Sequence, residues 1–172
     1  MKATVLIPAA GMGRRMGSSV NKQYLDLAGR PILAHTLALF ERHPQIEHIY
    51  PIVPVDEIDF CRQQIIEKYA FSKVRKLVPG GAERQDSVRN GLRALQADGL
   101  DQPERIVLVD DGARPLFNPQ LLPELLKRIA EHGACVVAAP AKDTIKEVDD
   151  GVISATPQRQ RVWLAQTPQG VR

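Results

Sequence analysis

The stretch VLIPAAGMGRRMGSSVNKQYLDLAGRPIL, from Val5 to Leu33, begins as an apolar strand and ends as the first turn of a helix. Between them lie two closely spaced glycines, Gly11 and Gly13, and the cations Arg15 and Lys22. The pattern GxxxxGK[ST] has no match, and GxGxxG fails because its third glycine comes one residue late. Glycine backbone can approach phosphate oxygens closely, and the cations supply more charge than a pyrophosphate bridge requires. The segment therefore favours a loop along a triphosphate over a tight turn with solvated arginines.

The composition is that of a globular protein with one domain. The chain has 172 residues and a net charge of +3, which is too mild and too dispersed to predict a nucleic-acid surface. No apolar run is long enough to span a membrane, and the histidines show no metal-ligand spacing. Cys61 and Cys135 are far apart and form no CxxC motif, which indicates a reducing compartment. We expect a cytoplasmic protein that binds neither nucleic acid nor membrane.

Strand and helix patterns alternate along the first 140 residues. Apolar runs predict strands at residues 4–8, 46–53, 74–78, 105–109 and 134–139. Helical spacing predicts helices at residues 31–43, 56–69 and 84–97, and one that follows the cap Asn118-Pro119. This alternation predicts an α/β fold with a parallel sheet, in which ligands bind beyond the carboxyl ends of the strands.

The pattern changes after Pro140. The segment KDTIKEVDDGVISATP, residues 142–157, predicts a β-hairpin with Asp150-Gly151 as its turn. A lone hairpin is marginally stable, so this one needs another sheet or a second subunit to pack on. The sequence stops after QTPQGVR without a polar tail, which we interpret as a truncated chain that lacks a last strand or helix.

Two further segments follow predicted strands and offer groups for a ligand. In GGAERQDSVRNGL, the backbone of Gly81 and Ala82 and the hydroxyl of Ser87 could read the edge of a base, although an ordinary helix start is an equal alternative. In VDDGARP, acids at a strand end precede Arg114, and such an acid can orient a polar substrate or contact a metal ion. Thr144, Arg159 and Thr167 would individually be read as surface residues.

Together these motifs resemble one family. The segments PAAGMGRRM, KQYL, GGAERQDSV, VDDGARP, PAKDTIK and RVWLAQTPQ, in this order, are similar to the 2-C-methyl-D-erythritol 4-phosphate cytidylyltransferase family of the non-mevalonate isoprenoid pathway. The resemblance implies a Rossmann-like, mostly parallel sheet flanked by helices, of nucleotidyltransferase type, with an extended β-arm. It also implies a single domain over residues 1–172, with the arm at about residues 141–160 and a C-terminal portion missing. The arm would join a homodimer.

The resemblance also assigns roles to particular residues. It assigns stabilisation of the transition state to Arg15, Lys22 and Arg159. Nucleotide binding falls to Pro8, Ala9, Ala10, Gly11, Gly13, Lys22, Gly81, Ala82, Ser87 and Gly112. Binding of the polyol phosphate falls to Asp111, Arg114, Thr144, Arg159 and Thr167, some of them across the dimer. Asn21 departs from the family, where proline is frequent before the lysine, and this changes the stiffness of the loop but not its charge.

The implied reaction joins CTP to a polyol phosphate. The substrate phosphate is itself the nucleophile, so no serine or cysteine triad is required, and a divalent ion such as Mg²⁺ would be held mainly by the phosphates of CTP. A related acceptor such as ribitol 5-phosphate is an alternative that the sequence leaves open. A non-catalytic nucleotide-binding protein is a second alternative, against which the intact Arg15 and Lys22 argue.

Overall fold

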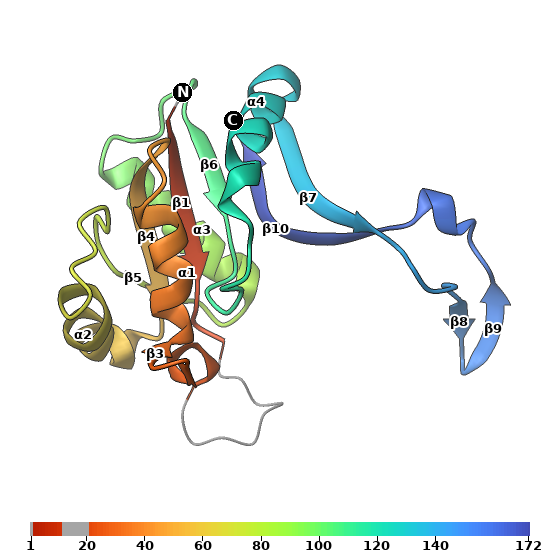
Figure 1. Cartoon of the computed structure of the whole chain (residues 1–172), viewed down its shortest axis with the longest axis horizontal. Coiled ribbons are helices and arrows are strands. Elements are labelled where there is room, and N and C mark those ends of the chain that lie inside the picture. The colour runs from red at the N-terminus through yellow and green to blue at the C-terminus, as the bar shows by residue number, and fades with distance from the viewer. Residues whose placement is uncertain (1, 12–20) are drawn as a thin grey trace.

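A six-stranded sheet with helices on both faces forms the centre of the molecule (Figure 1). The computed structural model describes residues 2–11 and 21–172. Across the sheet the strands are β5 (Val78–Pro79), β4 (Ile46–Val53), β1 (Ala3–Pro8), β6 (Ile106–Val109), β10 (Trp163–Val171) and β7 (Ala134–Pro140). The pairs β5–β4, β4–β1 and β1–β6 are parallel, whereas β10 is antiparallel to both β6 and β7. The predicted mostly parallel α/β sheet is confirmed.

The helices follow the predicted alternation. They are α1 (Ile32–Glu41), α2 (Ile58–Cys61), α3 (Arg84–Ala97) and α4 (Leu122–His132). Short helical turns are η2 (Lys22–Tyr24), η3 (Val55–Glu57), η4 (Arg62–Glu67), η5 (Pro119–Leu121) and η6 (Arg159–Arg161), and a small ribbon pairs β2 (Asp26–Leu27) with β3 (Arg30–Pro31). The predicted cap is present, since the Asn118 side chain accepts a hydrogen bond from the Gln120 N–H. No helix in the described ranges is both long and apolar enough to cross a membrane.

Strand β1 is buried from both sides because its side chains alternate between two apolar clusters. Val5 and Ile7 belong to the larger cluster, which includes residues of α1 and α4. Leu6 belongs to the smaller cluster, with Leu95 of α3. Burial on both faces explains why residues 4–8 read as a continuous apolar run. It also fixes the carboxyl end of β1, where the glycine loop begins.

Three sequence predictions require correction. The expected strand at residues 74–78 is only an isolated bridge at Val74, opposite Ile49, followed by the two-residue β5, because backbone pairing with β4 is interrupted between Arg75 and Val78. The expected helix at residues 56–69 is divided into a 3₁₀ turn, one α-helical turn and a π-helical segment. The strand predicted at residues 134–139 exists as β7, but it pairs with β10 and not with a parallel neighbour.

The predicted hairpin is present and extends away from the sheet (Figure 1). It pairs β8 (Glu147–Asp149) with β9 (Val152–Ala155). Its turn residues Asp150 and Gly151 have φ values of 49° and 80°, the left-handed conformation that an Asp-Gly turn favours. The strands β7 and β10 lead to this hairpin, and we call residues 141–160 the arm. The apolar side chains of the hairpin strands β8 and β9 are exposed, with Val152 at 70% and Ile153 at 59%.

Candidate active site

A cavity of about 350 Å³ lies where the carboxyl ends of β1 and β6 meet the N-terminus of α3. Many of the residues singled out from the sequence line it, namely Pro8, Ala9, Ala10, Gly11, Lys22, Gly81, Ala82, Ser87, Asp111, Gly112 and Arg114. Segments distant in sequence meet here because parallel strands end at the same edge of the sheet. Gly13 and Arg15 lie outside the described residues.

The floor of the cavity requires a glycine at position 112. The Gly112 N–H donates to the Pro8 carbonyl at 3.0 Å, and its own carbonyl accepts from the Thr36 hydroxyl at 3.1 Å. A Cβ at this position would lie 2.7 Å from the Cβ of Ala9, which is too close for a side chain. The turn after β6 is therefore pressed against the end of β1, and the two strand ends form one continuous surface.

The N-terminus of α3 forms a second wall. A capping box links Glu83 and Asp86, and the Glu83 N–H donates to Asp86 Oδ2 at 3.2 Å. The buried Ser87 hydroxyl accepts from the Gly81 N–H at 3.0 Å. Ser87 therefore orients the loop of Gly81 and Ala82, and its own hydroxyl proton is donated to no described residue. A helix N-terminus with glycine backbone beside it favours anions.

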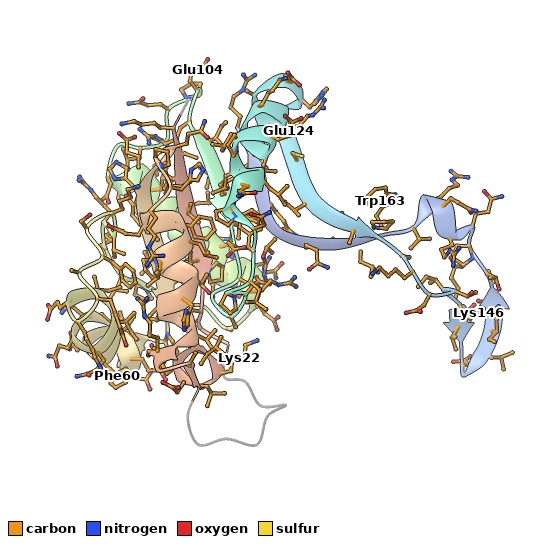
Figure 2. The ribbon with its side chains drawn as sticks, in the orientation of Figure 1. Lys22, Phe60, Glu104, Glu124, Lys146 and Trp163 are labelled. Carbon is orange, nitrogen blue, oxygen red and sulfur yellow. The ribbon has the colours of Figure 1, made fainter. Side chains whose placement is uncertain are left out.

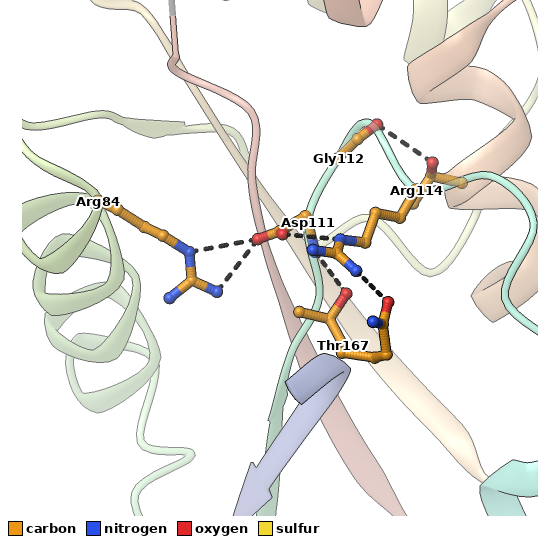
Figure 3. A network of polar contacts seen from close by, with 7 residues as sticks. Arg84, Asp111, Gly112, Arg114 and Thr167 are labelled. Atoms are coloured by element: carbon orange, nitrogen blue, oxygen red, sulfur yellow. Dashed lines mark hydrogen bonds and ion pairs between the residues drawn. The ribbon is translucent and has the colours of Figure 1, made fainter. Parts of the chain in front are cut away.

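Asp111 is the centre of a network of ion pairs at the cavity edge (Figure 3). Its Oδ1 accepts from Arg84 Nε at 3.2 Å and Nη2 at 3.1 Å, and its Oδ2 accepts from Arg114 Nε at 3.0 Å. Arg114 also donates to Gln166 Oε1 at 2.6 Å. The network joins α3, the turn after β6 and β10 across the edge of the cavity. It orients two guanidinium groups there.

Lys22 enters the cavity from the opposite side. It is the first residue of η2, and its side chain is exposed at the end of the domain where the strands β1 and β4 finish (Figure 2). Lys22 forms no ion pair with any residue in the described ranges. Its charge is therefore available to an anionic ligand.

Asp110 lies directly behind the network and is fully buried. Its N–H donates to the Leu6 carbonyl at 3.0 Å, whereas both carboxylate oxygens lack a hydrogen-bond partner among the described residues. The neighbouring Thr167 hydroxyl accepts from the Asp111 N–H at 3.4 Å, and its proximity to Asp110 lowers the pKa of that carboxyl. Burial raises the pKa of Asp110 to about 7, and the charge of Asp111 adds to the rise.

The remaining predicted residues lie elsewhere in the chain. Thr144 and Arg159 are exposed on the arm, where Arg159 Nη1 donates to the Lys142 carbonyl at 3.0 Å, and neither lines the cavity of its own chain. Thr167 is buried beneath Asp111. The sequence interpretation missed Gln23, Glu83, Arg84 and Ala113, which also line the cavity. The sequence signal that could have found them is their place within two residues of Lys22, Ala82 or Gly112.

The comparison with protein families identifies the family of this chain. The family model described as 2-C-methyl-D-erythritol 4-phosphate cytidylyltransferase matches residues 3–172. A protein of that name from Syntrophotalea carbinolica is 58% identical over 172 residues, which are 100% of this chain and 72% of the relative. One from Geobacter metallireducens is 53% identical over 100% of this chain and 73% of the relative.

Solved structures share the fold. The crystal structure of a 4-diphosphocytidyl-2C-methyl-D-erythritol synthase has a TM-score of 0.81 at 32% identity and covers 99% of this chain and 74% of its own. The synthase from Anaerococcus prevotii has a TM-score of 0.81 at 29% identity, with 99% and 70% covered. The nucleotidyltransferase fold with its β-hairpin is therefore shared over nearly all of this chain.

Proposed function

Because the chain belongs to the 2-C-methyl-D-erythritol 4-phosphate cytidylyltransferase family, we propose that the cavity at the ends of β1 and β6 is its active site. The enzyme transfers the cytidylyl group of CTP to 2-C-methyl-D-erythritol 4-phosphate. A phosphate oxygen of the acceptor forms a bond to the α-phosphorus of CTP. The bond from that phosphorus to the oxygen bridging to the β-phosphate breaks, and pyrophosphate leaves with the electron pair.

The main obstacle is charge, since two polyanions must approach each other. Lys22 supplies a cation without a partner among the described residues, and the backbone after β1 and the N-terminus of α3 supply N–H donors. Arg15 would act with Lys22 from the glycine loop. We assign these groups to the triphosphate because charge accumulates there as the bond to pyrophosphate breaks.

The loop of Gly81 and Ala82 suits the base of CTP. Ser87 holds the Gly81 N–H, so the backbone of the loop is fixed before a ligand arrives. Asp111, Arg114 and Thr167 then lie toward β10, on the side suited to the acceptor. The paired guanidinium groups around Asp111 fit an acceptor that carries both hydroxyls and a phosphate.

We propose that the chain forms a homodimer, in which the arm completes the active site of the partner subunit. Thr144 and Arg159 lie on the arm, and neither lines the cavity of its own chain. The arm exposes apolar side chains that a partner would cover, including Val152 and Ile153. We propose that Thr144 and Arg159 reach the acceptor phosphate bound to the partner subunit.

A magnesium ion fits this cavity only as a companion of the substrate. The described residues contain no group of three or more His, Cys, Asp or Glu side chains able to hold a metal, and Asp111 is already paired with Arg84 and Arg114. The phosphate oxygens of CTP would therefore provide most of its ligands. A bound ion of this kind neutralises charge on the triphosphate.

The observation that carries the assignment of roles is the position of Lys22 at the cavity wall, where it forms no ion pair with a described residue. If its charge acts mainly in the transition state, Lys22→Ala lowers turnover at least roughly a hundredfold and changes CTP affinity much less. Single-turnover pyrophosphate release and the CTP dissociation constant measure the two effects separately. The matched control is Lys127→Ala, which removes an exposed lysine of α4. Near-normal turnover of Lys22→Ala at saturating CTP would show that the loop only binds.

A further inference from the structure

One carboxylate, that of Glu57, contacts both of the side chains that flank Lys22. Asn21 Nδ2 donates to Glu57 Oε1, and Gln23 Nε2 donates to Glu57 Oε2 at 3.5 Å. The two amide side chains stand on either side of Lys22 in the sequence, so each oxygen of Glu57 holds one neighbour of the lysine. Glu57 itself is half-buried at the end of η3.

A second contact strengthens the attachment. The Tyr24 ring meets the Phe60 ring edge to face, with centroids 5.0 Å apart, and Phe60 belongs to α2 directly after Glu57. The Tyr24 hydroxyl is buried beside Glu57 and Cys61, and burial raises its pKa so that the phenol stays neutral. Lys22 and Phe60 are labelled at the same end of the domain in Figure 2.

The backbone conformation of Asn21 is one that a proline would also adopt. Asn21 has φ −60°, the value that a proline ring imposes, and ψ 136°, which proline also permits. Asparagine does not restrict φ in this way, so the position is held by the side-chain bond to Glu57. The hydrogen bond to Glu57 therefore restrains the backbone at position 21, where a proline ring could restrain it instead.

From these contacts we infer that Glu57 is a positioning residue for the transfer reaction, which fixes Lys22 at the cavity through Asn21 and Gln23. The inference rests on the role proposed for Lys22. Glu57 does not line the cavity, and Gln23 lines it with a buried side chain. Its effect therefore passes through the placement of η2. A displaced catalytic group can cost roughly a hundredfold in rate for a shift of about 1 Å, so a remote anchor of this kind has a measurable effect.

The central test compares three variants at Glu57 and its neighbour. Glu57→Ala removes both acceptors, and we expect turnover to fall roughly ten- to a hundredfold with a smaller change in CTP affinity. Glu57→Gln keeps one acceptor for Asn21. Its new amide can donate to Gln23 Oε1, which has no partner among the described residues, once the Gln23 amide turns over, so most activity is retained. The control is Asp56→Ala, which removes the adjacent exposed acid of η3. If Glu57→Gln is as slow as Glu57→Ala, charge rather than hydrogen bonding is responsible, and the inference is overturned.

A rescue separates positioning from a general loss of folding. Asn21→Pro imposes the observed φ without Glu57, so adding Glu57→Ala to Asn21→Pro is expected to change turnover less than about threefold. Adding Glu57→Ala to Lys22→Ala is expected to change nothing further, because the group being positioned is gone. If Glu57→Ala is equally damaging in all backgrounds, Glu57 does not act through Lys22.

Hydrogen exchange tests the anchor independently of the catalytic role of Lys22. The Tyr24 N–H donates to the Asn21 carbonyl at 2.9 Å, and the Leu25 N–H donates to the Lys22 carbonyl at 3.3 Å. Glu57→Ala is expected to accelerate exchange of these two amides, and Asp56→Ala is not. Accelerated exchange together with a fully active Lys22→Ala would refute the proposed role of Lys22 and leave the anchor in place. Unchanged exchange in Glu57→Ala would refute the anchor.

Discussion

Replacing Asp110 by asparagine should change how the stability of the protein depends on pH. Asp110 is 0% exposed, and neither of its carboxylate oxygens has a hydrogen-bond partner among the described residues. Burial raises its pKa from 3.8 to about 7. The nearby Thr167 hydroxyl opposes this rise, the charge of Asp111 adds to it, and the guanidinium groups of Arg114 and Arg84 oppose it. Asparagine has nearly the same shape and no charge at any pH.

The sign follows from the raised pKa. Between pH 4 and 7 the folded protein keeps a proton on Asp110 that the unfolded chain releases, so stability falls as pH rises through this range and is level above it. A shift of about 3 pKa units corresponds to about 4 kcal/mol, the upper limit of the loss on going from pH 4 to pH 8. For a chain of this size that corresponds to about 10 °C in Tm. The Asp110→Asn variant lacks this contribution.

The assay is the free energy of unfolding by urea, followed by far-ultraviolet circular dichroism from pH 5 to pH 8.5. We expect the stability of Asp110→Asn relative to the original chain to increase steadily up to about pH 7 and then to remain constant. The buried amide can add a constant offset of either sign, so the informative quantity is the difference between the two slopes. The control Asp101→Asn, at an exposed loop position, should follow the original curve. Parallel curves for the original chain and Asp110→Asn would refute the reasoning.

Two further outcomes follow from the loop of Gly81 and Ala82 and from the arm. Gly81→Ala would place a Cβ against the Asp86 side chain and 3.0 Å from the Asp86 carbonyl carbon, so the loop must move. We expect this variant to bind CTP roughly tenfold more weakly in calorimetric titration. Unchanged affinity would show that the loop does not contact the nucleotide. Replacing residues 142–156 by a short glycine–serine link removes the exposed hairpin and should give a monomer without transferase activity in light scattering and pyrophosphate-release assays. A dimer that persists without the hairpin would show that the arm is not the interface.

The local sequence was sufficient for most of the elements and for much of the site. The strand at residues 46–53 and the helix at residues 84–97 were predicted with the observed limits, because apolar periodicity reports burial directly. The Asp150-Gly151 turn was predictable since few residues adopt its left-handed conformation. The cavity walls were predictable because the carboxyl ends of parallel strands share one edge.

The tertiary structure alone decided how distant segments pair. Strand β10 inserts between β6 and β7 in antiparallel orientation, and no local pattern in residues 163–171 specifies that partner. The salt bridges of Arg84 to Asp111 and the hydrogen bond of Asn21 to Glu57 join residues 27 and 36 positions apart. Asp110 and Asp111 are adjacent acids in the sequence, yet one is fully buried and the other is paired at the surface of the cavity. Periodicity and turn chemistry act over a few residues, whereas the burial and charge environment of a side chain depend on which segments the folded chain brings beside it.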